Sequence, residues 1–386
     1  MSKARELASL GNAYSDGALS NRNLIINGAC NVQQRVTPTT THASYGTVDR
    51  MRLTCGGGTT TLDAGTVASG TEPYALGFRN TARLTNTVAG SDATADYAAV
   101  ATFLEAQNVA TSGWDYTSTS GKMTLSFWVK SSVAGTYTAR FEAYDVVPTT
   151  KNYSISFTIP ANTWTKVVKT ISGDSALQFD MNSYVGLGLY IWAYIGSNYT
   201  TSTNPVDTWD DLDGADQTLD HPQNWKAVSG ATFEVTGLML EVGDTATPFE
   251  HRSYGQELQA CRRFYHAYEI TGWERAGSGA GLMGWHNGTD TTYYSIYFFP
   301  SEMRAIPTAS CSVSGTPLFR LYERGGTSTI SLSNGTAGVD ARTGQIGKLS
   351  SYIKYVTASG YTNGSIGNLS MGGNAGYIRW AWDAEL

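Results

Sequence analysis

Three glutamates have the chemistry to cleave a glycosidic bond, provided that two of them flank the same substrate. Hydrolysis of that bond uses a pair of carboxyl groups, one on either side of it. Glu142 lies in a segment where apolar and polar residues alternate, and Glu234 and Glu241 lie in another. The sequence does not show which carboxylates face one another across strands. We therefore expect these side chains to be solvated or ion-paired, with a polysaccharide depolymerase as the alternative.

Other catalytic and metal-binding patterns are missing from the sequence. It has no GxSxG elbow, no P-loop and no HExxH spacing among its five histidines. The acidic run DTWDDLDGADQTLD places Asp211 and Asp213 before Gly214, but Trp209 stands where the first ligand of a calcium loop belongs. We expect a solvated loop, with a structural calcium as the alternative. The predictions are therefore no catalytic residue, no metal site, no cofactor and no enzymatic activity.

Aromatic and charged residues at every second position suit a sugar-binding face. Alternation of period two directs one set toward the core and the residues between them outward; on one segment the inward set is Leu187, Leu189, Ile191, Ala193 and Ile195. A pyranose stacks its apolar C–H face on an aromatic ring while its hydroxyls bond to polar groups. The alternative is that this face packs against another subunit or domain. The predicted glycan-binding residues are Trp128, Arg140, Glu142, Tyr144, Tyr190, Trp192 and Tyr194.

Short strands position these residues, so the predicted fold class is all-β. Alternating stretches separated by Gly-rich turns favour a jelly-roll β-sandwich for residues 23–252. The composition changes between Ser253 and Tyr268, where a short helical turn precedes an aromatic strand. We place a smaller C-terminal β-sandwich tip in residues 253–386. Residues 1–22 are predicted to be a short N-terminal helix and a linker, because Leu7, Leu10 and Tyr14 have helical spacing.

The composition excludes several classes of protein. A formal net charge of −6, without a basic window, argues against nucleic acid as a partner. The first residues contain charges and no long apolar run, which argues against a signal peptide and membrane insertion and predicts synthesis in a cytoplasm. The four cysteines are scattered and form no CxxC pair, so we expect buried free thiols: Cys30, Cys55, Cys261 and Cys311.

Several sequence patches resemble those of tail-fibre and receptor-binding proteins of tailed bacteriophages, notably marine phages and cyanophages. The patches are NRNLIINGACNVQQR, TVDRMRL, MTLSFWVKSSVAGTY, FEVTGLMLEVGDTATPFEHRSYGQELQACRRFY and the closing DAEL. The stretch from Phe233 to Tyr265 is the most specific of them. The resemblance implies a jelly roll like that of carbohydrate-binding modules, a β-rich tip and assembly as a homotrimer.

Together these observations predict a fibre subunit of the virion that is made in the host cytoplasm. The N-terminus is expected to attach to the phage tail or an adaptor protein, because a helix this short is marginal alone in water. The expected ligand is a host surface glycan or envelope receptor. The alternatives are a structural virion protein, such as a tail adaptor or capsid-decorating subunit, and the depolymerase considered above.

Overall fold

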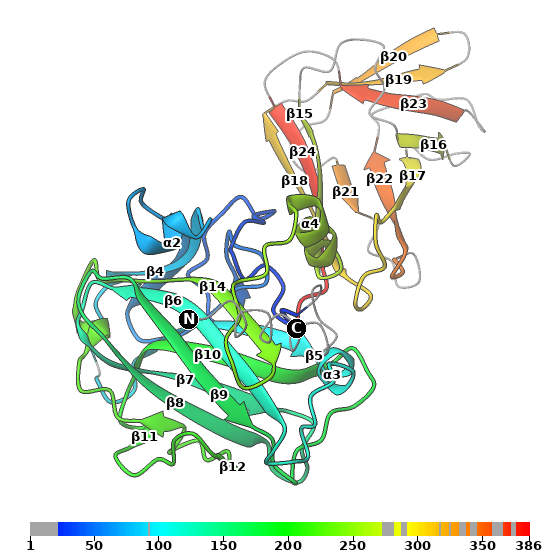
Figure 1. The fold of residues 1–386 in the computed structure, drawn as a ribbon. Helices are drawn as coiled ribbons and strands as arrows, with labels where there is room; N and C mark the ends of the chain where they lie inside the picture. The colour runs from blue at the N-terminus through cyan, green and yellow to red at the C-terminus, as the bar shows by residue number, and fades with distance from the viewer. Residues whose placement is uncertain are drawn as a thin grey trace. The chain divides into compact units, whose positions relative to one another are not determined.

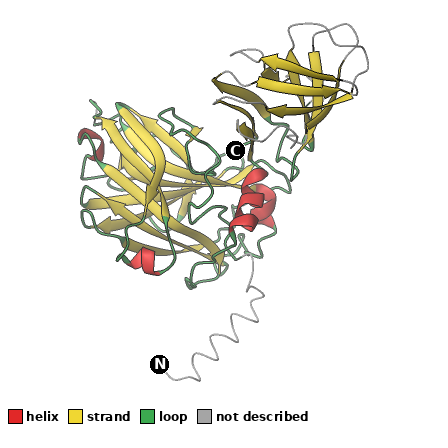
Figure 2. Ribbon diagram, turned by 90° about the horizontal axis from the view of Figure 1, so that it is seen from above, coloured by secondary structure: helices red, strands yellow, loops and turns green. Residues whose placement is uncertain are grey.

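The chain divides into two units, and each is described by itself. The computed structural model describes residues 22–271 except residue 92, together with residues 282–286, 292–315, 318–323, 326–331, 337–339, 346–356, 366–371 and 376–386. The first unit, the body, comprises Met1–Glu257 and Leu386, and the second, the tip, comprises Leu258–Glu385. The predicted N-terminal helix lies outside the described residues. Strands dominate both units (Figure 2), which confirms the all-β fold class.

The body is a sandwich of two large antiparallel sheets (Figure 1). One sheet has seven strands in the order β1 (Ser44–Tyr45), β2 (Arg52–Gly56), β5 (Tyr97–Glu105), β10 (Val185–Ile195), β7 (Gly135–Ala143), β8 (Lys151–Ile159) and β12 (Trp209–Asp211). The other has five, in the order β3 (Thr59–Thr66), β4 (Asn80–Val88), β14 (Thr232–Val242), β6 (Lys122–Ser131) and β9 (Thr165–Ser172). Shorter elements are the parallel pair β11 (Thr200–Thr201) and β13 (Thr218–Leu219), with α2 (Glu72–Ala75), α3 (Ala106–Ala110) and η1 (Trp225–Ala227).

The core of the body lies between these sheets, as the alternation of apolar residues predicts. Leu125 and Phe127 of β6 and Leu189 and Ile191 of β10 are at most 1% exposed and belong to one apolar cluster. Neighbouring positions on the same strands therefore point to the outer faces of the sandwich. Those two outer faces hold all of the predicted glycan-binding residues except Tyr194.

The tip also consists of antiparallel strands. Helix α4 (Tyr254–Arg262) spans the division between the units and precedes β15 (Tyr265–Thr271), which agrees with the predicted helix turn and aromatic strand. One sheet has the order β15, β24 (Gly376–Asp383) and β18 (Thr308–Gly315). The other has the order β20 (Gly326–Ser331), β19 (Leu318–Glu323), β23 (Ile366–Met371), β16 (Leu282–His286), β17 (Thr292–Phe298), β22 (Ser350–Val356) and β21 (Ala337–Val339).

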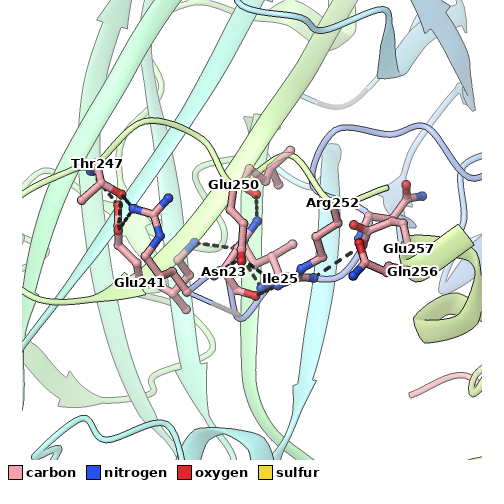
Figure 3. Close-up of polar contacts among 12 residues, drawn as sticks. Asn23, Ile25, Glu241, Thr247, Glu250, Arg252, Gln256 and Glu257 are labelled. Carbon is pink, nitrogen blue, oxygen red and sulfur yellow. Dashed lines mark hydrogen bonds and ion pairs between the residues drawn. The ribbon is translucent and has the colours of Figure 1, made fainter. Parts of the chain in front are cut away.

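The two ends of the body are joined by a polar clasp (Figure 3). We define it as Arg22, Asn23, Asn27, Glu241, Thr247, Glu250, Arg252 and Glu257. The backbone N–H of Asn23 donates to Glu250 at 2.9 Å, and Arg252 donates to the carbonyl oxygen of Asn23. Arg252 also forms ion pairs with Glu250 at 3.2 Å and Glu257 at 3.7 Å, and Glu257 accepts from the N–H of Asn27. The start and the end of the body are therefore fixed side by side.

None of the four cysteines forms a disulfide, as predicted. The prediction of burial is correct for Cys30 and Cys261 but wrong for Cys55 and Cys311, which are half-buried. Burial raises the pKa of the Cys30 thiol to about 12, so it stays protonated and unreactive at neutral pH.

No helix in the described part of the chain has the length and apolar character needed to cross a membrane.

Candidate binding face of the seven-stranded sheet

Five of the predicted glycan-binding residues come together on the outer face of the seven-stranded sheet. Strands β7 and β10 are neighbours, and their register places Arg140 opposite Tyr190 and Glu142 opposite Gly188. Trp192 follows two positions further along β10, and Tyr144 directly follows β7. The hydroxyl groups of Tyr144 and Tyr190 are 2.7 Å apart. Period-two alternation therefore identifies the middle of this face correctly.

Trp128 does not belong to this face, and the prediction that it does was wrong. Its strand, β6, lies in the five-stranded sheet, so its ring points away from the core on the opposite side of the sandwich. There Trp128 is 4% exposed and packs with Ala29, Val67 and Phe78. Alternation gives the side of a strand to which a residue points, but not the sheet to which the strand belongs.

Tyr194 was also placed wrongly, because β10 contains a bulge. The register with β5 shifts between Trp192 and Tyr194, and a bulge reverses the alternation beyond it. Tyr194 therefore joins the central core and donates from its hydroxyl to the carbonyl oxygen of Ala93 at 2.6 Å. Ile195, expected in the core, lies with Trp192 on the outer face instead.

A continuous row of aromatic rings crosses the face. The aromatic row, as we call it, runs from Tyr144 to Phe103, Tyr190, Trp192, Tyr97 and Tyr199, with successive ring centroids 5.6–6.5 Å apart. Tyr190 and Trp192 are stacked, with 8° between their planes. Their partners on β5 are Ala101 and Ala99, whose small side chains leave room beside the rings. The row is thus built by three adjacent strands and the loop after β10.

Two arginines flank the aromatic row from opposite sides. The guanidinium of Arg140 lies 4.9 Å from the ring centre of Tyr190 and donates to Glu142 at 2.5 Å. On the other side, the guanidinium of Arg52 lies 4.0 Å from the ring centre of Phe103. Such contacts between a cation and a ring fix the orientation of both groups. The face therefore combines apolar ring surfaces with oriented charged hydrogen-bonding groups.

The tyrosine hydroxyls near Glu142 are held in the protonated form. Burial, with the charge of Glu142, raises the pKa of Tyr144 well above its ordinary value. The same two causes raise the pKa of Tyr190. The hydroxyl of Tyr144 donates to Glu142, which also accepts from Arg140. These four groups form one network with a defined direction of each hydrogen bond.

The loop of residues 196–223 covers part of this face. Gln217 accepts from Arg140 with its side-chain oxygen and from Asn152 with its carbonyl oxygen, while His221 is 2.8 Å from the hydroxyl of Thr138. As a result Tyr190 is 6% and Trp192 3% exposed, whereas Tyr144 is 36% exposed. The expectation of an exposed face was therefore wrong for the two rings of β10. Tyr144 lies at one partly exposed end of the row, and Tyr97 and Tyr199, at the other end, are half-buried.

The three candidate carboxylates cannot act as a catalytic pair with one another. Glu142 and Glu234 lie on opposite outer faces of the sandwich, because Phe141 and Phe233 beside them point into the shared core. Glu234 and Glu241 are seven residues apart on one strand, which spans roughly 20 Å, against roughly 5–10 Å in glycosidases. All three are paired: Glu142 with Arg140, Glu234 with Lys130 at 2.7 Å, and Glu241 with the Thr247 hydroxyl at 2.6 Å.

The acidic run after β11 is tied to its surroundings. Asp211 pairs with Lys151 at 2.7 Å, and Asp216 accepts from Thr201 at 2.7 Å and Asn204 at 2.9 Å. Within the described ranges, no group of three or more His, Cys, Asp or Glu residues is arranged to hold a metal ion. The carboxylates of the acidic run thus act as hydrogen-bond and ion-pair acceptors that hold the loop of residues 196–223 in place.

Sequence reasoning missed four members of this face: Arg52, Phe103, Tyr97 and Tyr199. Strand β5 reads YAAVATFLE and is buried along almost its whole length, so alternation does not reveal which of its sides faces outward. A weak signal was available, because Tyr97 and Phe103 flank Ala99 and Ala101 at period two. Arg52 and Tyr199 gave no comparable signal, since their positions depend on strand order and loop path.

No family model matches the sequence, and no curated protein matches it. Similar solved structures include the enzymatically active domain of tailspike protein 4 of bacteriophage CBA120, with 12% identity, a TM-score of 0.32 and coverage of 57% of this chain and 21% of the tailspike chain. A family 11 carbohydrate-binding module of Clostridium thermocellum has 13% identity, a TM-score of 0.27 and coverage of 57% and 100%.

A cyclase from Fischerella sp. TAU is similar to the same degree, with 11% identity, a TM-score of 0.31 and coverage of 58% of this chain and 98% of the cyclase. The chain thus spans only about a fifth of the tailspike chain, whereas it covers nearly the whole of the other two. The three similar structures are a tailspike domain, a carbohydrate-binding module and a cyclase, and the similarity to each is distant. It therefore does not identify a ligand of this chain.

Proposed function

We propose that this chain is a non-enzymatic adhesion protein of a tailed bacteriophage, a tail-fibre or receptor-binding subunit that binds host surface glycans. The observation that carries the proposal is the aromatic row with Arg52, Arg140 and Glu142 beside it. The sequence patches that resemble phage fibre proteins support the biological setting. No cofactor is required for binding of this kind.

The chemistry of the face suits a sugar. The rings offer apolar surfaces on which the C–H faces of a pyranose stack, and the charged groups offer donors and acceptors to its hydroxyls. Tyr144 is 36% exposed, and its hydroxyl is oriented by Glu142 and Tyr190. Tyr97 and Tyr199, at the other end of the row, are half-buried, whereas Phe103 is only 3% exposed. Binding at one such site is expected to be weak, because the accessible area is small.

Attachment to a cell would then depend on several sites acting together. In a homotrimer three faces are carried by one fibre, and several fibres on one particle raise the effective concentration of receptor further. The N-terminal segment would join the fibre to the tail or to an adaptor. This arrangement requires no tight individual contact.

Binding and labelling experiments test the proposal. Purified protein is incubated with surface polysaccharide from the host, and we expect retention on the immobilised polysaccharide without release of reducing ends. Antibodies against the body are expected to label fibres at the tail in electron micrographs. Release of reducing ends would establish a depolymerase instead.

The burial of the inner rings favours one alternative, a structural virion protein in which the aromatic row only holds the covering loop. Tyr190 and Trp192 are nearly inaccessible, and Gln217 already occupies the side of Arg140. In that case host polysaccharide is not retained, and antibodies label the capsid or the tail tube. The same two measurements therefore separate the alternatives.

A further inference from the structure

The guanidinium groups of Arg52 and Arg140 lie beside the aromatic row, and the Nε atom of each has no hydrogen-bond partner among the described residues. From this we propose that the ligand is an anionic sugar unit, bearing a carboxylate or a sulfate ester, recognised by Arg52 and Arg140. The inference rests on the proposed function, since it names the class of glycan bound at the same face.

Arg52 is a cation without a charge partner. Within the part of the chain that the structure describes, no carboxylate forms an ion pair with it, and its guanidinium is 3.5 Å from the hydroxyl of Tyr190. It is half-buried, so its charge is only partly hydrated. A partly buried charge is costly unless a counter-charge is supplied. An anionic ligand supplies that charge.

The other charges near the row do not compensate Arg52. Glu142 is already bonded to Arg140 and Tyr144. Glu105, at the end of β5, accepts from Gln107 at 2.5 Å, and Arg50 nearby adds another cation, which donates to the carbonyl oxygen of Phe103. Neither Glu142 nor Glu105 therefore pairs with Arg52.

Several buried donors on the face have no hydrogen-bond partner among the described residues. They are the Nε atoms of Arg52 and Arg140 and the indole Nε1 of Trp192. Arg140 and Trp192 are each 3% exposed. The obligate acceptors in the same condition are Oδ1 of Asn152 and, in the covering segment, Oδ1 of Asn204 and Oε1 of Gln223. Two of the donors belong to guanidinium groups, for which an anionic oxygen is a stronger acceptor than a neutral hydroxyl.

Gln217 shows where a ligand oxygen would bind. Its amide oxygen accepts from Arg140 on the outer side of the aromatic row. A carboxylate or sulfate oxygen is a stronger acceptor for a guanidinium than an amide oxygen is. We infer that the anionic group replaces Gln217 at Arg140 and moves the loop of residues 196–223 away. The residues Arg52 and Tyr144 remain accessible to make the first contact.

Titration calorimetry with matched oligosaccharides tests this inference. The probes are oligogalacturonate, the same oligomer after reduction of its carboxyl groups, a sulfated galactan and a neutral galactan. We expect the anionic probes to bind about tenfold more tightly than their neutral counterparts. The preference for uronate or for sulfate identifies the source of the anion. Added salt is expected to weaken the anionic contacts at the exposed side.

Two arginine variants provide the matched comparison. Arg52→Gln is expected to abolish the preference for anionic probes, whereas Arg79→Gln is expected to keep it. Arg79 makes a similar contact with an aromatic ring, 3.8 Å from the centre of Tyr74, but it directly precedes β4 of the five-stranded sheet. Equal binding of reduced and unreduced oligomers would overturn the ligand class and leave the proposed function intact. Failure of all glycans, host polysaccharide included, would overturn both.

Discussion

At the scale of single residues, substitution of Tyr144 tests whether the aromatic row binds sugar. Tyr144→Ala removes the accessible ring, and we expect glycan affinity to fall about 5- to 30-fold, which corresponds to about 1–2 kcal/mol. The thermal midpoint should also fall, because the buried Glu142 loses the hydroxyl that donates to it. Tyr184→Ala is the control, since Tyr184 is 71% exposed and lies outside the row. Equal losses in both variants, measured by calorimetry, would exclude Tyr144 as a binding residue.

Trp192 has a different role, because its ring is buried. Alternation along the strand predicts an outward-facing ring for Trp192, but a ring that is 3% exposed contributes to packing. We expect the substitution to lower the free energy of unfolding by about 3–5 kcal/mol. Urea denaturation measures this change, and Trp192→Phe should cost markedly less. A loss of stability below about 1 kcal/mol would show that the ring is more accessible than described.

The sequence predicts the place of a site residue where that place depends on local alternation, and fails where it depends on a bulge or on strand order. Arg140, Glu142 and Tyr190 were placed correctly because alternation along one uninterrupted strand is a local property. Tyr194 was misplaced because a bulge between Trp192 and Tyr194 has no recognisable local signature. Strand order decides the side on which Trp128 lies, and it results from contacts between distant segments. The all-β class follows from local patterns alone.

At the scale of elements, the loop of residues 196–223 responds to acid through His221. Burial lowers the pKa of His221 to about 3, compared with about 6.5 in an unfolded chain. Below pH 6.5 the unfolded chain therefore binds a proton that the folded chain does not. We expect the free energy of unfolding to fall as the pH decreases from 6.5 toward 3, by at most about 1.4 kcal/mol per unit.

The slope is best measured between pH 7 and pH 5, where most carboxylates remain ionised. Urea denaturation at each pH gives the slope for the natural chain and for His221→Gln, in which the side chain does not titrate. The variant should show a flatter dependence. His266 of the tip, whose pKa is lowered to about 4 mainly by burial, contributes to both curves. Identical slopes would mean that His221 is accessible to protons in the folded protein.

The polar clasp is the second element with a measurable contribution. Arg252→Ala removes two ion pairs and a hydrogen bond to the backbone of Asn23 at a site that is only 16% exposed. We expect the body to lose about 2–3 kcal/mol of stability, because two carboxylates remain without their cation. Lys151→Ala is the control. It breaks a pair with Asp211, which is 64% exposed, and should cost less than about 1 kcal/mol.

At the scale of the whole molecule, we expect a homotrimer. The fibre resemblance implies threefold assembly, and a short N-terminal helix gains stability by association. Light scattering on the purified chain should give three times 41.4 kDa. A chain without residues 1–21 should keep its folded body, since the core and the clasp begin after that segment, but should no longer attach to the particle. A stable monomer at micromolar concentration would contradict the expectation.

Under the proposed function, the polar clasp also determines how the body bears tension between a particle and a cell. Asn23 contacts Glu250 and Arg252 while Asn27 contacts Glu257, so the two segments run in the same direction. A pull on the residues before 22 and after 257 therefore loads these contacts in shear, together rather than one after another. Force spectroscopy should show a lower rupture force for Arg252→Ala than for Lys151→Ala. The load then passes through the clasp and not through the two sheets. The candidate face of the seven-stranded sheet therefore keeps its shape while the proposed fibre is stretched.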